Sequence, residues 1–174
     1  MTWTAPNVDR PYTNVSNAER AALQDWLRFH RETLLMKCSG LAPERLSVKS
    51  VEPSRLTLLG LVRHMAENER WWFRIRAAGV DIEPIYPDVE NDFDPAFDDL
   101  GNADAEADFA MFRAECEAAD AAVASFELDD TITLPKSGRT MDLRWIYLHM
   151  IEEYARHNGH ADLLRERLDG VTGD

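Results

Sequence analysis

The chain has few cysteines, no long hydrophobic run and no excess of basic residues, and each shortage excludes a class of protein. Its 174 residues contain only two cysteines, Cys38 and Cys116, too few for a disulfide framework. Neither cysteine has the spacing of a structural zinc site or a redox motif. We therefore expect two free thiols in a cytoplasmic protein.

Hydrophobic runs are short throughout the chain. None approaches the roughly 20 apolar residues that a membrane-spanning helix needs. The first 14 residues also lack the basic segment and apolar stretch of a secretory signal. We therefore expect neither membrane insertion nor secretion.

Basic residues are outnumbered, because 19 Lys and Arg stand against 32 Asp and Glu and give a formal net charge of −13. The basic residues do not gather along one segment, so the chain is not expected to bind nucleic acid. The acidic excess is concentrated in residues 81–108. This run does not match a calcium-binding loop, because Phe93 replaces the turn glycine and no Glu stands at the twelfth position, so we expect a solvated loop.

The sequence contains four amphipathic segments. A capping box at Ser16–Glu19 predicts a helix that runs to about Cys38. Three further helices are predicted over residues 55–78, 104–126 and 142–168, with Asp104 as an N-cap. Residues 1–15 are expected to form an irregular arm, and 129–140 a short hairpin.

These predictions define an all-α fold. With little strand and no internal repeat, the sequence predicts one domain over residues 1–174, built as a four-helix bundle. A long acidic loop, residues 79–103, would connect the second and third helices and could overhang a site. A plain connection between helices explains the same loop equally well.

Polar side chains interrupt the apolar stripe of two predicted helices. On the fourth helix, Glu153 and His157 lie one turn apart within a stripe of Leu143, Ile146, Met150, His160 and Leu164. An unpaired buried carboxylate costs several kcal/mol, so Glu153 requires a partner or a water-filled cleft. The second helix has a similar stripe that contains His64: Leu61, His64, Asn68, Trp71 and Ile75.

Packing of the second helix against the fourth would bring His64, Glu153 and His157 together. Two imidazoles and a carboxylate with open coordination positions are typical of a catalytic metal site. Arg156 and His160 would then contact the ligands or a substrate anion, although Arg156 also suits a solvated surface. A buried histidine is more often a core residue than a ligand, and a Glu/His pair one turn apart is common on surfaces. His149 and His157 do not form HExxH, which excludes a zinc protease of that type.

Three stretches resemble one known superfamily: "LLMKCSGLAPERL" at 34–46, "LLGLVRHMAENERWWF" at 58–73 and "LRWIYLHMIEEYARHNGHADLLRERLDG" at 143–170. Over residues 20–170 the chain resembles the DinB-like superfamily, in an actinobacterial branch of unknown function. The resemblance implies a four-helix bundle of the up-down-down-up type that is frequently dimeric. It also implies a divalent metal held by three helix residues, commonly three histidines.

Carried over to this chain, the resemblance places the first metal ligand at His64, the last at His157 and the middle one at Glu153. This His/Glu/His set is similar to that of mycothiol-dependent maleylpyruvate isomerases and mycothiol S-transferases, which are thought to use zinc, while other relatives carry nickel or iron. The resemblance implies a zinc-dependent S-transferase that activates a low-molecular-weight thiol such as mycothiol for attack on a small electrophile, and a homodimer. The alternatives are a non-enzymatic metal-binding or stress-response module, and a metal-assisted hydrolase or isomerase.

Overall fold

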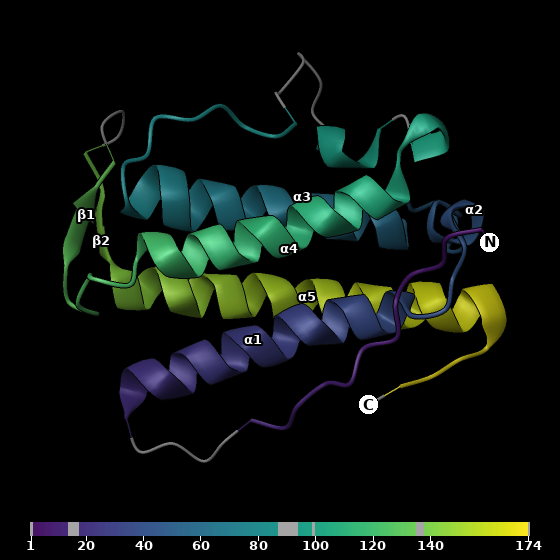
Figure 1. The fold of residues 1–174 in the computed structure, drawn as a ribbon, viewed down its shortest axis with the longest axis horizontal. Helices are drawn as coiled ribbons and strands as arrows, with labels where there is room; N and C mark the ends of the chain where they lie inside the picture. The colour runs from purple at the N-terminus through teal and green to yellow at the C-terminus, as the bar shows by residue number, and fades with distance from the viewer. Residues whose placement is uncertain (1, 14–17, 87–93, 99, 135–137, 174) are drawn as a thin grey trace.

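The protein is mostly helical. The computed structural model describes residues 2–13, 18–86, 94–98, 100–134 and 138–173 (Figure 1). The helices are α1 (Glu19–Cys38), α2 (Pro43–Leu46), α3 (Leu58–Glu69), the π-helix η1 (Arg70–Ala77), the 3-10 helices η2 (Pro95–Phe97) and η3 (Leu100–Asn102), α4 (Ala105–Ala122) and α5 (Leu143–Asp169). Strands β1 (Thr131–Thr133) and β2 (Thr140–Asp142) pair antiparallel as the predicted hairpin. Helices make up most of the described chain and each strand has only three residues, so the all-α class is confirmed.

The long helices lie side by side along the long axis of the molecule. Helix α1 packs mainly on α5, α3 packs mainly on α4, and α3 also packs on α5. Figure 1 shows that α1 and α5 run in one direction and that α3 and α4 run in the opposite direction. The two helices that carry the predicted metal ligands, α3 and α5, are therefore neighbours.

Short polar side chains start three of these helices. Thr57, Asp104 and Asp142 each accept a hydrogen bond from the backbone N–H three residues later, at 3.0, 3.1 and 2.7 Å. Such caps satisfy amide donors that the first turn leaves without a helical partner. The predicted cap at Asp104 is confirmed.

The sequence predicts that a capping box of Ser16 and Glu19 starts α1. Helix α1 begins at Glu19, and its N-cap is Ala18, which makes no side-chain capping bond. Ser16 lies outside the described residues. Glu19 forms an ion pair with Arg144 at 2.5 Å instead, so its carboxylate links α1 to the start of α5.

The predicted helix over 55–78 differs from the structure in both start and type. Helix α3 begins at Leu58, and from Arg70 the chain continues as a π-helix. A π-helix bonds each N–H to the carbonyl five residues earlier, so its inward face drifts away from the α-helical stripe. Phe73 and Ala77 are buried, whereas Trp71 and Ile75 of the predicted stripe are only partly buried.

Part of the acidic loop packs on α3, so the prediction of a fully solvated loop is wrong for residues 94–98. The Phe97 ring is buried over Gly60. A β-carbon at Gly60 would lie 2.3 Å from the Phe97 Cδ1 atom, so glycine permits this close approach. Asp98 adds an ion pair with Arg55 at 2.7 Å. Residues 87–93 of the loop lie outside the described part of the chain.

Replacing Gly60 by alanine is therefore expected to destabilise the fold. The new methyl group would force the Phe97 ring away from α3, and overpacking of this kind costs about 1–3 kcal/mol. Gly159→Ala in α5 is the matched control, because a β-carbon there meets nothing within 4 Å. Removing a glycine from a helix interior should stabilise by up to about 1 kcal/mol. Urea unfolding of metal-free protein measures both changes, and equal midpoints for the two variants would contradict the packing argument.

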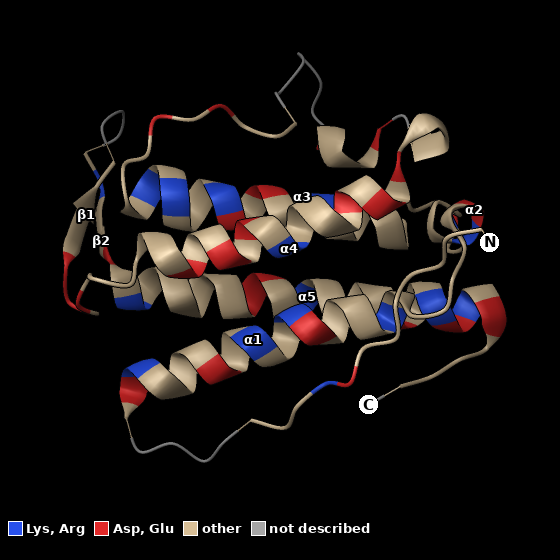
Figure 2. Cartoon of the chain, in the orientation of Figure 1, with Lys and Arg blue, Asp and Glu red and all other residues tan. Residues whose placement is uncertain are grey.

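Basic residues at the η1 end of α3, visible in Figure 2, do not form a free basic patch. Arg70 and Arg74 both donate to the buried carboxylate of Glu115 on α4, at 2.6 and 2.7 Å. Burial alone would raise the pKa of Glu115, but the two arginines lower it below its ordinary value. The guanidinium of Arg76 lies over the Trp71 ring at 4.1 Å. These arginines therefore serve the packing of η1 and α4.

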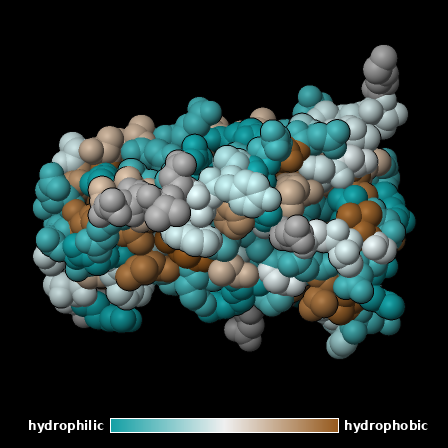
Figure 3. Space-filling view, turned by 90° about the horizontal axis from the view of Figure 1, so that it is seen from below, coloured by the Kyte–Doolittle hydropathy of each residue, from teal (hydrophilic) through white to brown (hydrophobic). Residues whose placement is uncertain are grey.

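Apolar side chains are dispersed on one face of the molecule. Figure 3 shows several separate hydrophobic patches with hydrophilic residues between them on the face that it draws. Apolar residues dispersed in this way are usual on exposed faces and do not by themselves mark an interface. Among the described residues, no helix is both long enough and apolar enough to cross a membrane.

Candidate metal centre

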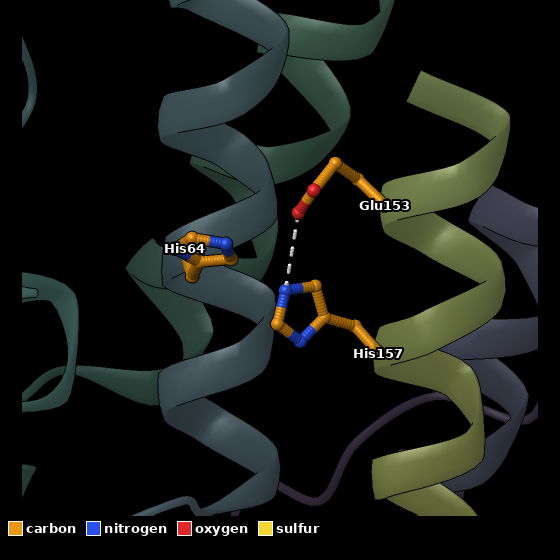
Figure 4. Close-up of side chains that lie close together, drawn as sticks. All are labelled: His64, Glu153 and His157. Atoms are coloured by element: carbon orange, nitrogen blue, oxygen red, sulfur yellow. Dashed lines mark ion pairs between the residues drawn. The ribbon is translucent and has the colours of Figure 1, made fainter. Parts of the chain in front are cut away.

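Three sequence-predicted ligands meet between α3 and α5. His64 comes from α3, and Glu153 and His157 come from successive turns of α5. Each residue offers one ligand atom, and these atoms all lie within 4.8 Å of one another. Figure 4 shows the three side chains pointing towards each other. The His64 and His157 rings are 4.7 Å apart between centroids, and His157 Nε2 is 3.4 Å from Glu153 Oε2.

The three side chains are partly buried rather than fully enclosed. The exposed fractions are 19% for His64, 14% for Glu153 and 12% for His157. The predicted stripe placed Glu153 and His157 on the core face of α5, but Tyr154 and Asn158 occupy the fully buried positions. The pair lies one residue to the side, facing α3. The three side chains are therefore largely shielded from bulk water but keep some contact with solvent.

The chemistry of these donors fits a divalent transition metal. Imidazole nitrogens and a carboxylate oxygen are the ligands of catalytic zinc sites, which keep further coordination positions open. A ligand imidazole must be neutral. Burial, together with the neighbouring His64, lowers the pKa of His157 to about 4, so its ring is neutral at pH 7.

The two other predicted site residues contact these donors. Arg156 donates to Glu153 Oε1 at 2.7 Å and also pairs with Glu152. The second carboxylate oxygen, Oε2, is the one that faces His157. Nδ1 of His160 lies 3.3 Å from His157 Nδ1, on the side of the ring away from Glu153. Arg156 therefore contacts the candidate ligand Glu153, and His160 contacts the candidate ligand His157.

Two residues at the site were not predicted as functional. Asp94, at the N-cap of η2, contacts His64 Nδ1 through Oδ2, and Asn68 donates to His64 Nε2 at 2.9 Å. Burial alone would raise the pKa of Asp94, but the hydrogen bond with His64 lowers it. Asn68 was visible as a polar member of the α3 stripe. Nothing in the acidic run distinguishes Asp94 from its neighbours, because its role depends on how the loop packs on α3.

A second group of potential ligands shares Glu153. It consists of His149, Glu152 and Glu153, also with ligand atoms within 4.8 Å of one another. However, Glu152 is 51% exposed and paired with Arg156, and the His149 ring is stacked on Trp145 at 4.9 Å. The more buried set with two imidazoles is therefore the stronger candidate.

The remaining histidine and both cysteines lie elsewhere. Asn158 donates to the main-chain carbonyl of His30 at 3.1 Å, so His30 belongs to the contact between α1 and α5. Burial raises the pKa of Cys38 to about 12 and also raises that of Cys116. The thiolate is the reactive form of cysteine, so neither residue is suited to be a nucleophile at neutral pH.

Comparison with known protein families identifies a match over most of the chain. The family model described as Mycothiol-S-transferase matches residues 22–170, a range that includes His64, Glu153 and His157. No curated protein and no solved structure matches the chain significantly.

Proposed function

The chain belongs to the mycothiol S-transferase family, and we propose that it is a zinc-dependent enzyme that transfers the sulfur of a low-molecular-weight thiol, such as mycothiol, to a small electrophile. The observation that carries this proposal is the convergence of His64, Glu153 and His157 at a partly open edge between α3 and α5. The family match supplies the thiol substrate class.

His64, Glu153 and His157 would hold the metal. When bound, zinc would lower the pKa of the substrate thiol, so that a thiolate is available at neutral pH. Nickel or iron would also suit these donors, because all three ions accept imidazole and carboxylate ligands.

The chain's own side chains would prepare this site. Arg156 holds Glu153 Oε1 and leaves Oε2 directed at His157. His160 limits rotation of the His157 ring through the contact between their Nδ1 atoms. Burial raises the pKa of both cysteines, which disfavours their thiolates and favours a separate thiol as the source of the attacking sulfur.

The reaction itself is a substitution at the electrophile. The substrate sulfur forms a bond to the electrophilic carbon, and the bond between that carbon and the leaving group breaks. The leaving group departs with the bonding electron pair, and the thiol proton passes to solvent. No oxidant or reductant is required.

We further propose that the helices form the DinB-like four-helix bundle of the up-down-down-up type, as a single domain over residues 1–174. The parallel course of α1 and α5 and the opposite course of α3 and α4 support this arrangement. A homodimer is part of the same proposal, because the superfamily that the sequence resembles is frequently dimeric.

Thiol consumption by zinc-loaded protein tests the proposed function. Mycothiol is incubated with a panel of alkylating electrophiles, and loss of free thiol is followed together with the mass of the conjugate. We expect conjugate formation above the uncatalysed rate with wild type, and only the uncatalysed rate with metal-free protein or His64→Ala. Zinc-loaded wild type that accelerates no conjugation in the panel would contradict the transferase and favour a metal-binding module without catalysis.

A further inference from the structure

His64 is contacted at both ring nitrogens, each by a different element. Asp94 Oδ2, from the segment before η2, contacts Nδ1. Asn68, one turn further along α3, approaches Nε2 with its amide nitrogen at 2.9 Å. The same amide nitrogen donates to the main-chain carbonyl of His64 at 3.1 Å, which fixes the orientation of the Asn68 amide.

These two contacts select one tautomer of His64. A carboxylate only accepts hydrogen bonds, so Nδ1 must carry the proton that it donates to Asp94. An amide nitrogen only donates, so Nε2 must present its lone pair to Asn68. The two assignments agree: Nε2 carries the lone pair that a metal would bind, and a bound metal would replace Asn68 as the partner of Nε2.

Asp94 is itself held in place by the packing of its segment. Its other oxygen, Oδ1, accepts the backbone N–H of Ala96 at 2.9 Å and caps η2. Phe97, three residues after Asp94, is buried over Gly60. Gly60 lies one turn before His64 on α3. Asp98 adds only an exposed ion pair with Arg55, which contributes little to this attachment. The carboxylate therefore has both oxygens engaged on a segment anchored to the helix that carries His64.

We infer that Asp94 is a positioning residue for metal binding: its carboxylate holds the His64 ring in the Nδ1–H tautomer and aims Nε2 at Glu153 and His157. The inference rests on the proposed metal site, and it adds a residue from the acidic loop to that site. A histidine ligand whose other nitrogen donates to a carboxylate is oriented and made more basic, and loss of such a partner typically lowers metal affinity 10–100-fold.

Substitution of Asp94 by asparagine makes the effect measurable. Asparagine has one amide oxygen. If that oxygen continues to cap Ala96, the amide nitrogen faces His64 Nδ1 and donates to it. Both ring nitrogens would then face amide donors, so the Nδ1–H tautomer would lose its acceptor and the tautomer equilibrium would shift towards a proton on Nε2, the ligand position. Asp98→Asn is the matched control, because it removes the same charge from the same segment without a contact to His64.

Zinc affinity is the first readout, measured by competition with a chromophoric chelator and independent of any catalysed reaction. We expect Asp94→Asn to bind zinc about 10–100-fold more weakly than wild type, and Asp98→Asn to bind it within about twofold of wild type. Equal losses in both variants would overturn the inference and indicate a general effect of loop charge.

The tautomer of His64 is the second readout, measured by nitrogen NMR on metal-free, ¹⁵N-histidine-labelled protein at pH 8. We expect the Nδ1–H form in wild type and Asp98→Asn, and a shift towards the Nε2–H form in Asp94→Asn. An unchanged tautomer in Asp94→Asn overturns the inference. This readout needs no metal, so it tests Asp94 even if wild type binds no zinc, a result that would instead refute the proposed function.

Discussion

Wild-type protein purified without a nickel affinity step is expected to contain about one zinc ion per chain, and Glu153→Ala and His64→Ala are expected to contain almost none. The reason is the donor count. Among the described residues, three potential ligands meet at this site, so each substitution leaves two. Two donors do not retain a divalent ion through dialysis at neutral pH. Metal content by mass spectrometry gives the measurement.

Glu152→Ala is the matched control for this prediction. It removes the same charge from the neighbouring position of α5, and it also removes a ligand of the second candidate group, His149, Glu152 and Glu153. We expect Glu152→Ala and His149→Ala to keep their zinc. Retention in His64→Ala together with loss in His149→Ala would place the metal in the second group and refute the site proposed above. A wild type that binds no zinc after incubation would leave Glu153 and the neutral His157 as a partly buried polar pair with no metal role.

The second large effect concerns stability. Glu69→Ala is expected to lower the free energy of unfolding by about 3–5 kcal/mol, because it leaves the buried guanidinium of Arg31 without its main partner. Arg31 Nε and Nη2 donate to the two oxygens of Glu69 at 2.8 and 2.7 Å. The hydroxyl of Tyr154 donates to the same carboxylate at 2.7 Å. One buried carboxylate thus joins α1, α3 and α5.

Asp120 provides the comparison within the same network. It also accepts from Arg31, at 3.0 Å, but it is 56% exposed. Partly solvated ion pairs contribute about 0–1 kcal/mol, so Asp120→Ala should cost far less than Glu69→Ala. Urea unfolding of metal-free protein measures both. A loss from Asp120→Ala as large as that from Glu69→Ala would contradict the assignment of Glu69 as the central residue.

Glu69→Gln is a second variant that can be measured if Glu69→Ala does not fold. Glutamine keeps the length of the side chain and one acceptor, but it removes the charge that offsets Arg31. We expect an intermediate loss of stability, because an uncompensated buried charge is costly even when one hydrogen bond remains. The network shares its helices with the candidate metal centre, since Glu69 follows Asn68 on α3 and Tyr154 follows Glu153 on α5. Weakening it should also loosen the spacing between α3 and α5.

Much of the fold was predictable because it depends on neighbours in the sequence. Asp104 and the hairpin strands were identified from local chemistry, and the structure confirms them. The helix over 55–78 was predicted only in part. The switch to a π-helix at Arg70 is a change in hydrogen-bond register, and residue periodicity does not report it when Trp71, Trp72 and Phe73 are all apolar.

The candidate site, like the fold, was predictable only in part. Glu153 and His157 lie one turn apart on one helix, so their proximity follows from helix geometry alone. His64 required an assumption, that the second and fourth helices pack together, and the contact between α3 and α5 bears this out. Asp94 required knowledge of a loop that lies against α3 through Phe97 and Gly60, and no local pattern encodes that contact.

The sequence by itself determined the all-α class, the polar cap at Asp104 and the residues that could hold a metal. These depend on side-chain chemistry and on contacts between residues within a few positions of one another. The tertiary structure decided which face of α5 is fully buried, how Glu69 joins three helices and which acidic residue reaches His64. Such contacts join residues more than 25 positions apart, and their energies depend on burial that only the packed chain creates.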